Sequence, residues 1–252
     1  MSSAKPHIQS RLSNQIGYVL INRPESHNAI SRQMWLDIPT HMQQLMKEGA
    51  RILVIEGCEG AFAAGADVYE LQSISSLEEA RLAWDAIEQA LDFVHSFPLP
   101  TIAAINGACL GGGCLLASSC DLRYASKRSR FSVPIAKLGI VIDDTTLGRL
   151  AALIGVSRCK ELIYRAAVID AQRAYDWGLL NDVFADEAFD ESMQNIYSQI
   201  LQNSDLSIKE AKTSFSRFTA LATSHSENEQ LVVASYIGPD FRQRVGSAFR
   251  KA

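Results

Sequence analysis

The 252-residue sequence lacks the features that mark several large classes of protein. Its longest apolar stretch, residues 99–116, is interrupted by Asn106 and four glycines, so it does not predict a membrane span. Residues 1–6 contain no apolar core of a signal peptide. The formal net charge of −4 provides no basic excess for binding a nucleic acid. We therefore expect a cytoplasmic protein that binds neither membranes nor nucleic acids.

The sequence also disfavours a metal site and a disulfide framework. It has five cysteines, an odd number, and no pair of them stands beside a histidine at the spacing of a zinc site. Reduced and mostly buried thiols are expected instead. The chain contains no long linker rich in proline, glycine or serine and no internal repeat. Its length then predicts one domain, or one domain with a small appendage.

The hydrophobic pattern predicts an α/β core over residues 1–185 and a helical region over residues 186–252. Turn residues Asn14 and Gln15 separate two alternating segments and indicate a hairpin. Ser31 and Ser76 are suitable N-caps for helices over residues 31–47 and 76–96. The strand-like segments are residues 7–13, 16–22, 51–56, 101–105, 121–125, 130–133 and 181–184.

The most informative segment contains three consecutive glycines, Gly111, Gly112 and Gly113. They follow the apolar residues 101–105 and precede the small residues 115–119, which predicts a strand, a glycine turn and a helix. The first N–H groups of a helix have no partner within the helix, and glycine lets a ligand approach them closely. An anion or oxyanion site is therefore one interpretation, and tight helix packing is the other. Neither the P-loop nor the dinucleotide-binding glycine spacing is present.

A second small-residue segment, residues 61–67, favours the oxyanion interpretation. It follows the apolar strand-like residues 51–56 and can direct another backbone N–H into the same space. Two N–H donors that meet on one carbonyl oxygen form an oxyanion hole.

Five segments, in order along nearly the whole chain, resemble signatures of the crotonase (enoyl-CoA hydratase/isomerase) superfamily. The resemblance implies a spiral core of ββα turns and C-terminal helices that hold a homotrimer or a dimer of trimers. It also implies a substrate carried as a coenzyme A thioester, with no prosthetic group and no metal. The segments are Asn22-Arg23-Pro24 with Asn28-Ala29, residues 61–67, residues 104–121, residues 171–180 and Gly246-Ser247-Ala248-Phe249.

The same resemblance assigns roles by position in this chain. The oxyanion N–H groups would belong to Ala66 and Gly112. Residues beside the bound acyl group would be Ala64, Asp67, Gly111, Leu115 and Ile135, with Asp67 expected to order the oxyanion loop. Contacts to the coenzyme A nucleotide would come from Arg23, His27, Ala29 and Tyr69, although many relatives carry a lysine where this chain has Tyr69.

The chain departs from the hydratases of this superfamily at both catalytic acids. Hydratases use one glutamate two residues after the glycine triplet and another after a Phe-x-x-Pro strand. Leu115 and Ile135 occupy these positions here. Neither side chain can exchange a proton, so the usual hydratase mechanism is not expected.

Asp143 is the best catalytic candidate. Its position matches a catalytic aspartate in dienoyl-CoA isomerases, in the ring-opening epoxyphenylacetyl-CoA isomerase group and in 4-chlorobenzoyl-CoA dehalogenase. The alternative is that Asp143 and Asp144 only cap a helix that begins near Thr145. Of the two, Asp144 is expected to be the better cap.

Glu88 is a second candidate acid. At helical spacing it shares a face with Trp84, Leu91 and His95, and it matches the position of a helper histidine in the dehalogenase. The alternative is a surface glutamate at the edge of an amphipathic helix. Ile135 replaces the aromatic residue that the dehalogenase has beside the ring, which disfavours that reaction.

These observations predict an enoyl-CoA isomerase in which Asp143 moves a proton to and from an enolate. Three alternatives remain open at this point. The first is acyl-CoA hydrolysis or a dehalogenase-like displacement, with Asp143 as nucleophile or water activator. The second is a hydratase or lyase that uses other groups, and the third is a coenzyme A-binding protein without catalysis.

Overall fold

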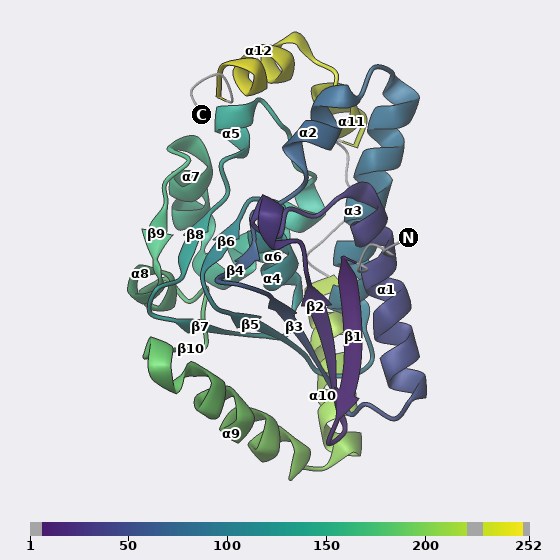
Figure 1. Ribbon diagram of the computed structural model, residues 1–252, viewed down its shortest axis with the longest axis vertical. Coiled ribbons are helices and arrows are strands. Elements are labelled where there is room, and N and C mark those ends of the chain that lie inside the picture. Colours follow the sequence, from purple (N-terminus) through teal and green to yellow (C-terminus); the bar gives the residue numbers. More distant parts are fainter. Residues whose placement is uncertain (1–6, 221–228, 249–252) are drawn as a thin grey trace.

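The computed structural model describes residues 7–220 and 229–248, which form two β-sheets surrounded by helices (Figure 1). The large sheet has strand order β1-β2-β3-β5-β7-β10, and only the β1–β2 pair is antiparallel. Its strands are β1 (Ile8–Ser13), β2 (Ile16–Ile21), β3 (Ile52–Gly57), β5 (Thr101–Ile105), β7 (Leu122–Ser126) and β10 (Asp182–Phe184). The small sheet contains β4 (Ala61–Ala63), β6 (Ala108–Leu110), β8 (Arg130–Ser132) and β9 (Ile169–Asp170).

The chain winds repeatedly from the large sheet to the small sheet and then into a helix. Strand β3 is followed by β4, β5 by β6 and β7 by β8, and each step leads on to helices. Gly107 makes the corner between β5 and β6 with φ +112°, and a methyl group there would lie 1.8 Å from the carbonyl oxygen of Gly60. Only glycine allows successive turns of the winding to approach this closely.

Helices cover this winding and supply the walls of the site. Ser31 and Ser76 cap α1 and α3 through their hydroxyl groups, as the sequence predicted. The helices are α1 (Arg32–Lys47), α2 (Val68–Ser73), α3 (Leu77–Ser96), α4 (Gly112–Ser119), α5 (Ile135–Leu138), α6 (Asp144–Ile154), α7 (Val156–Tyr164), α8 (Ala171–Asp176), α9 (Phe189–Leu201), α10 (Asp205–Ala220), α11 (Glu229–Ser235) and α12 (Pro239–Ala248), with 3₁₀ turns at Pro24–Ser26 and Asp186–Ala188.

Both faces of the large sheet are buried. Alternate strand residues such as Val19 and Leu53 face the main core, whereas Tyr18 and Val54 face a second core. Helix α9 covers the second face with Phe189, Met193 and Tyr197 and lies below the sheet in Figure 1. The main core also includes Val232, Tyr236, Phe241 and Val245 from the C-terminal segment. The described parts of residues 186–248 therefore share both cores with the preceding residues.

The predicted hairpin, the large-sheet strands and the two long helices are confirmed. Residues 61–63 and 108–110 are absent from the predicted strand segments but form β4 and β6 of the small sheet. All five cysteines are free, and Cys58 is the one that is partly exposed. Two segments noted in the sequence, residues 1–6 and Phe249, lie outside the described residues.

Gly107 provides a test of the close approach between successive turns. We expect Gly107→Ala to lower the free energy of unfolding by about 2–4 kcal/mol, because it adds both a steric overlap and a left-handed backbone penalty. Gly49→Ala is the matched control, since Gly49 has φ +99° but open space around the added methyl group. Urea titrations of both variants would check this, and equal losses would contradict it.

Candidate active site

The two glycine-containing loops lie directly against each other. A methyl group added to Gly65 would lie 3.0 Å from the backbone nitrogen of Gly112. One added to Gly112 would lie 3.2 Å from the backbone nitrogen of Ala66 and 3.1 Å from Cζ2 of Trp35. Because Gly65 and Gly112 have no side chains, the backbones of Ala66 and Gly112, the two predicted oxyanion residues, can lie close together.

The N–H groups of Ala66 and Gly112 are not used by the secondary structure. Ile30 forms a bridge around Ala66, donating to the carbonyl of Gly65 (2.8 Å) and accepting from the N–H of Asp67 (2.9 Å). Gly112 is the first residue of α4 and precedes the N–H groups that bond within the helix. Within residues 7–220 and 229–248, no hydrogen bond uses either N–H. Both donors are available to an oxygen atom.

Asp67 braces the loop that carries Ala66. Its Oδ1 accepts hydrogen bonds from the N–H groups of Tyr69 (3.0 Å) and Glu70 (3.3 Å) and so caps α2. Its Oδ2 accepts from Nη1 of Arg23 at 2.5 Å. Burial alone would raise the pKa of the Asp67 carboxyl, but Arg23 and the two backbone donors outweigh burial and lower that pKa. This supports the predicted loop-ordering role of Asp67.

Asn28 is a residue whose role sequence reasoning missed. It is fully buried, and its side-chain amide donates to the carbonyls of Cys58 (2.8 Å) and Ala61 (2.7 Å). Its Oδ1 accepts from the N–H of Arg23 (2.9 Å). Asn28 thus joins the segment before α1 to the turn between β3 and β4. Its place in the Asn28-Ala29 signature and its left-handed backbone (φ +58°) were the available signals.

The residues predicted to contact the nucleotide lie on neighbouring segments. They differ in how many hydrogen bonds they make within the protein. Arg23 is engaged with Asp67 and also donates to the carbonyl of Ala29 (3.3 Å). His27 is exposed, and its carbonyl accepts from the N–H of Ala64 (3.1 Å), which joins the two segments. The Tyr69 side chain is 68% exposed. Their contacts with coenzyme A remain predictions.

Asp143 caps α6, which corrects the expectation that Asp144 would be the better cap. Oδ1 of Asp143 accepts from the N–H of Thr146 (2.8 Å), because its extended backbone places the carboxylate over the first turn. Asp144 lies inside the first turn and is exposed. Asp143 is only 1% exposed, and its Oδ2 has no hydrogen-bond partner among the described residues. One oxygen of Asp143 therefore serves the fold and the other is uncommitted.

The surroundings of Asp143 include the C-terminal segment. Burial and the nearby charge of Asp143 raise the pKa of the Tyr236 phenol. The Tyr236 ring also packs against Trp84 of α3, with ring centroids 6.5 Å apart. Leu115 is buried in α4, and Ile135 is partly buried at the start of α5. Neither can replace the missing glutamates.

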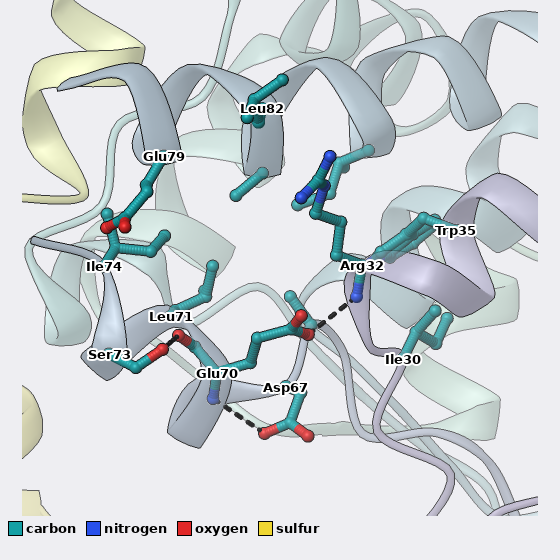
Figure 2. Close-up of a pocket in the computed structure, with 13 residues that line it drawn as sticks. Ile30, Arg32, Trp35, Asp67, Glu70, Leu71, Ser73, Ile74, Glu79 and Leu82 are labelled. Carbon is teal, nitrogen blue, oxygen red and sulfur yellow. Dashed lines mark hydrogen bonds between the residues drawn. The ribbon is translucent and has the colours of Figure 1, made fainter. Parts of the chain in front are cut away.

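A pocket of about 170 Å³ adjoins the oxyanion loop between α1, α2 and α3 (Figure 2). Its lining includes Ala66 and the apolar side chains of Trp35, Leu71 and Ile87. Figure 2 shows Arg32 and Glu70 on one side of the opening, joined by the Arg32 N–H to Glu70 bond (2.7 Å), with Glu79 across from them. Asp143 and Glu88 are not part of this lining.

Glu88 lies at the edge of the face predicted for α3. Trp84 and Leu91 on that face are buried in the main core, whereas Glu88 is partly exposed. His95 is also at the edge, and burial lowers the pKa of its imidazole. The structure does not bring Glu88 into the pocket beside Ala66, and its role as a second acid remains a prediction.

The described residues offer neither a cluster of metal-binding side chains nor a membrane-spanning helix. No group of three or more His, Cys, Asp or Glu side chains within residues 7–220 and 229–248 is placed to hold a metal ion. In the same part of the chain, no helix is long and apolar enough to cross a membrane.

The family model for enoyl-CoA hydratase/isomerase matches residues 11–243, a span that contains both oxyanion loops and Asp143. The chain belongs to the enoyl-CoA hydratase/isomerase family. Solved structures of crotonase fold agree with this membership. An enoyl-CoA hydratase from Bacillus anthracis is 26% identical, with a TM-score of 0.79 over 98% of this chain and 92% of that one. A methylmalonyl-CoA decarboxylase with 24% identity shares the fold, with a TM-score of 0.86 over 98% and 97% of the two chains.

Relatives within the enoyl-CoA hydratase/isomerase family include both isomerases and hydratases. An enoyl-CoA isomerase/hydratase of Mycosarcoma maydis is 32% identical over 209 residues, 79% of this chain and 76% of the relative. A crotonyl-CoA hydratase of Syntrophomonas wolfei is 33% identical over 200 residues, with the same coverage. A mitochondrial Δ(3,5)-Δ(2,4)-dienoyl-CoA isomerase of Mus musculus is 35% identical over 182 residues, 68% of this chain and 56% of the relative.

The Arg23–Asp67 brace predicts a defined acid sensitivity. Asp67→Asn removes the charge but keeps a side chain that caps helices well, so we expect a loss of about 1–3 kcal/mol in unfolding free energy at pH 7. The pKa of Asp67 in the folded state is lowered from 3.8. The wild type therefore exceeds Asp67→Asn in unfolding free energy by the full amount at pH values well above 3.8. This difference should shrink as the pH falls below about 4, since the unfolded carboxyl then binds protons first.

Urea titrations between pH 7 and pH 3 would measure this difference. Asp205→Asn is the control, because Asp205 forms an ion pair with Arg51 at the protein surface. A loss in the control as large as that in Asp67→Asn would contradict a special role for the loop brace.

Proposed function

We propose that this protein catalyses proton-transfer isomerisation of an enoyl-CoA, with Asp143 as the acid/base. The observation that carries this proposal is the buried carboxylate of Asp143, whose Oδ2 has no partner among the described residues. Leu115 and Ile135 occupy the two positions of the hydratase glutamates, so a water molecule has no paired acids to activate it there. The likeness to dienoyl-CoA isomerases adds support.

The proposed reaction begins with polarisation of the thioester carbonyl. Its oxygen accepts hydrogen bonds from the N–H groups of Ala66 and Gly112, which stabilise the negative charge that develops there. One such donor typically contributes on the order of 2.7–4 kcal/mol to the transition state. Asp143 then removes a proton from Cα or Cγ, and the electron pair of that C–H bond passes into an enolate. Asp143 then donates a proton to the other carbon, which regenerates the carboxylate and moves the double bond; exchange of the carboxyl proton with solvent between the two steps would introduce deuterium in deuterated water.

The capping geometry suits Asp143 to this role. The N–H of Thr146 holds Oδ1 at the start of α6 and so fixes the orientation of the carboxylate. Oδ2 is left for the substrate. Leu115 and Ile135 supply no acid at the positions of the hydratase glutamates, which favours return of a proton to carbon over hydration.

The remaining functional assignments form part of the same proposal. Arg23, His27, Ala29 and Tyr69 would line the path of the coenzyme A nucleotide, and Glu88 would serve as a second acid. Assembly as a homotrimer or dimer of trimers and a cytoplasmic location are likewise proposed from the sequence.

Asp143→Asn is the direct test. Asparagine is as good an N-cap as aspartate, so α6 should persist while proton transfer is lost. We expect kcat to fall about 10²–10⁴-fold, the usual contribution of a positioned acid/base. Asp144→Asn changes the exposed neighbour in the same way and should retain activity.

The assay would incubate 3-enoyl-CoA and 2-enoyl-CoA of matched chain length in deuterated water, followed by mass spectrometry. Deuterium at Cα or Cγ without added water, absent in Asp143→Asn, is the expected result. Full activity of Asp143→Asn would refute the assignment. Addition of water would show hydratase chemistry through other groups, and free coenzyme A would show hydrolysis.

A further inference from the structure

The hydroxyl group of Ser235 joins the C-terminal segment to the loop that leads into Asp143. Ser235 is the last residue of α11, and its Oγ accepts a hydrogen bond from the N–H of Val141 (3.1 Å). The same hydroxyl donates its own proton to the carbonyl of Val232 (2.7 Å). The donated bond fixes the rotation of the hydroxyl, so that a lone pair faces Val141.

The loop before Asp143 is short and spans residues 139–142. It begins after α5 with Gly139 at φ +71°, and the N–H of Ile140 bonds back to the carbonyl of Ile135 (3.1 Å). Asp143 then begins the capping interaction with α6. The Val141 bond to Ser235 connects this loop to α11 two residues before the carboxylate.

The Ser235 end of this tie is itself firmly held. Val232 and Val233 of α11 and the following Tyr236 are buried in the main core. The Tyr236 ring packs on Trp84 of α3 and on Phe241 of α12. Since α3 also lines the pocket beside Ala66 through Ile87, one helix sets both the pocket wall and the anchor of the Asp143 loop.

We propose that Ser235 is a positioning residue, whose hydrogen bond to Val141 fixes the Asp143 carboxylate relative to the Ala66 and Gly112 N–H groups. This inference rests on the proposed function of Asp143. The Thr146 cap holds the carboxylate from the C-terminal side, and Ser235 holds the backbone from the N-terminal side. Loss of the Ser235 bond would remove a restraint on the backbone at Val141 and leave the cap of α6 intact. A displacement of about 1 Å at a reacting group costs up to about 10²-fold in rate.

The test compares two substitutions of nearly equal shape, Ser235→Thr and Ser235→Val. Threonine keeps the hydroxyl and valine removes it. We expect Ser235→Val to lower kcat about tenfold with KM changed less than twofold, and Ser235→Thr to keep kcat within about threefold of the wild type. Hydrogen–deuterium exchange of the Val141 amide should become at least about tenfold faster in Ser235→Val.

Ser96→Val is the matched control. Ser96 also ends a helix and donates to a backbone carbonyl, that of Asp92 (2.8 Å), but it is exposed, and its hydroxyl joins no second element among the described residues. Its kcat and the exchange of the Val141 amide should not change. If Ser235→Val does not fold, Ser235→Ala and the protection of the Val141 amide in the wild-type protein provide the same test.

The outcomes separate this inference from the function on which it rests. Loss of activity in Asp143→Asn with unchanged kcat in Ser235→Val would overturn the role of Ser235 alone. An unprotected Val141 amide in the wild-type protein would also overturn it. Full activity in Asp143→Asn would overturn both proposals. A slower Ser235→Val enzyme with normal KM, rescued in Ser235→Thr, supports the positioning role.

Discussion

The contact between two stretches of bare backbone is the constraint on which the rest of this structure depends. Gly65 and Gly112 approach so closely that a methyl group on either would press on the backbone of the other loop. The small sheet brings the two loops together, because β4 and β6 pair directly and each loop begins where one of these strands ends. The large sheet, α1 and α3 then hold these short strands in place, since three-residue strands have too few bonds to be stable alone.

The sequence predicted those parts of the fold that have a repeating pattern. The large-sheet strands alternate between two buried faces, and α1 and α3 carry serine caps followed by apolar spacing. The strands β4 and β6 have three residues each and are rich in alanine, so their sequence shows no alternating period that predicts a strand. The oxyanion residues could be predicted because glycine and helix starts are local signals. The Ser235–Val141 bond joins residues 94 positions apart, and no local pattern indicates it.

Asp143 illustrates that one carboxylate can both cap a helix and be available for a catalytic role. Local chemistry favoured a cap, and resemblance favoured an acid/base; the carboxylate has two oxygens, and the structure commits only one. Asp144 was expected to be the better cap, but Asp143 caps α6. The extended backbone that enters the helix places residue 143, and not residue 144, at the N-cap position. That backbone is fixed from outside the helix by the loop over residues 139–142, whose conformation the sequence alone did not specify.

The bonds of Arg23 and Asn28 have a consequence for how a long ligand would be used. Both residues stand in the segment proposed to meet the nucleotide end of coenzyme A, yet Arg23 holds Asp67 and Asn28 holds the turn before β4. Part of the affinity for the nucleotide can therefore be spent on ordering the loop that carries Ala66. On the proposed function, a substrate truncated to its acyl end would then lose turnover as well as binding, because the missing nucleotide contacts would no longer help to order the proposed oxyanion donors.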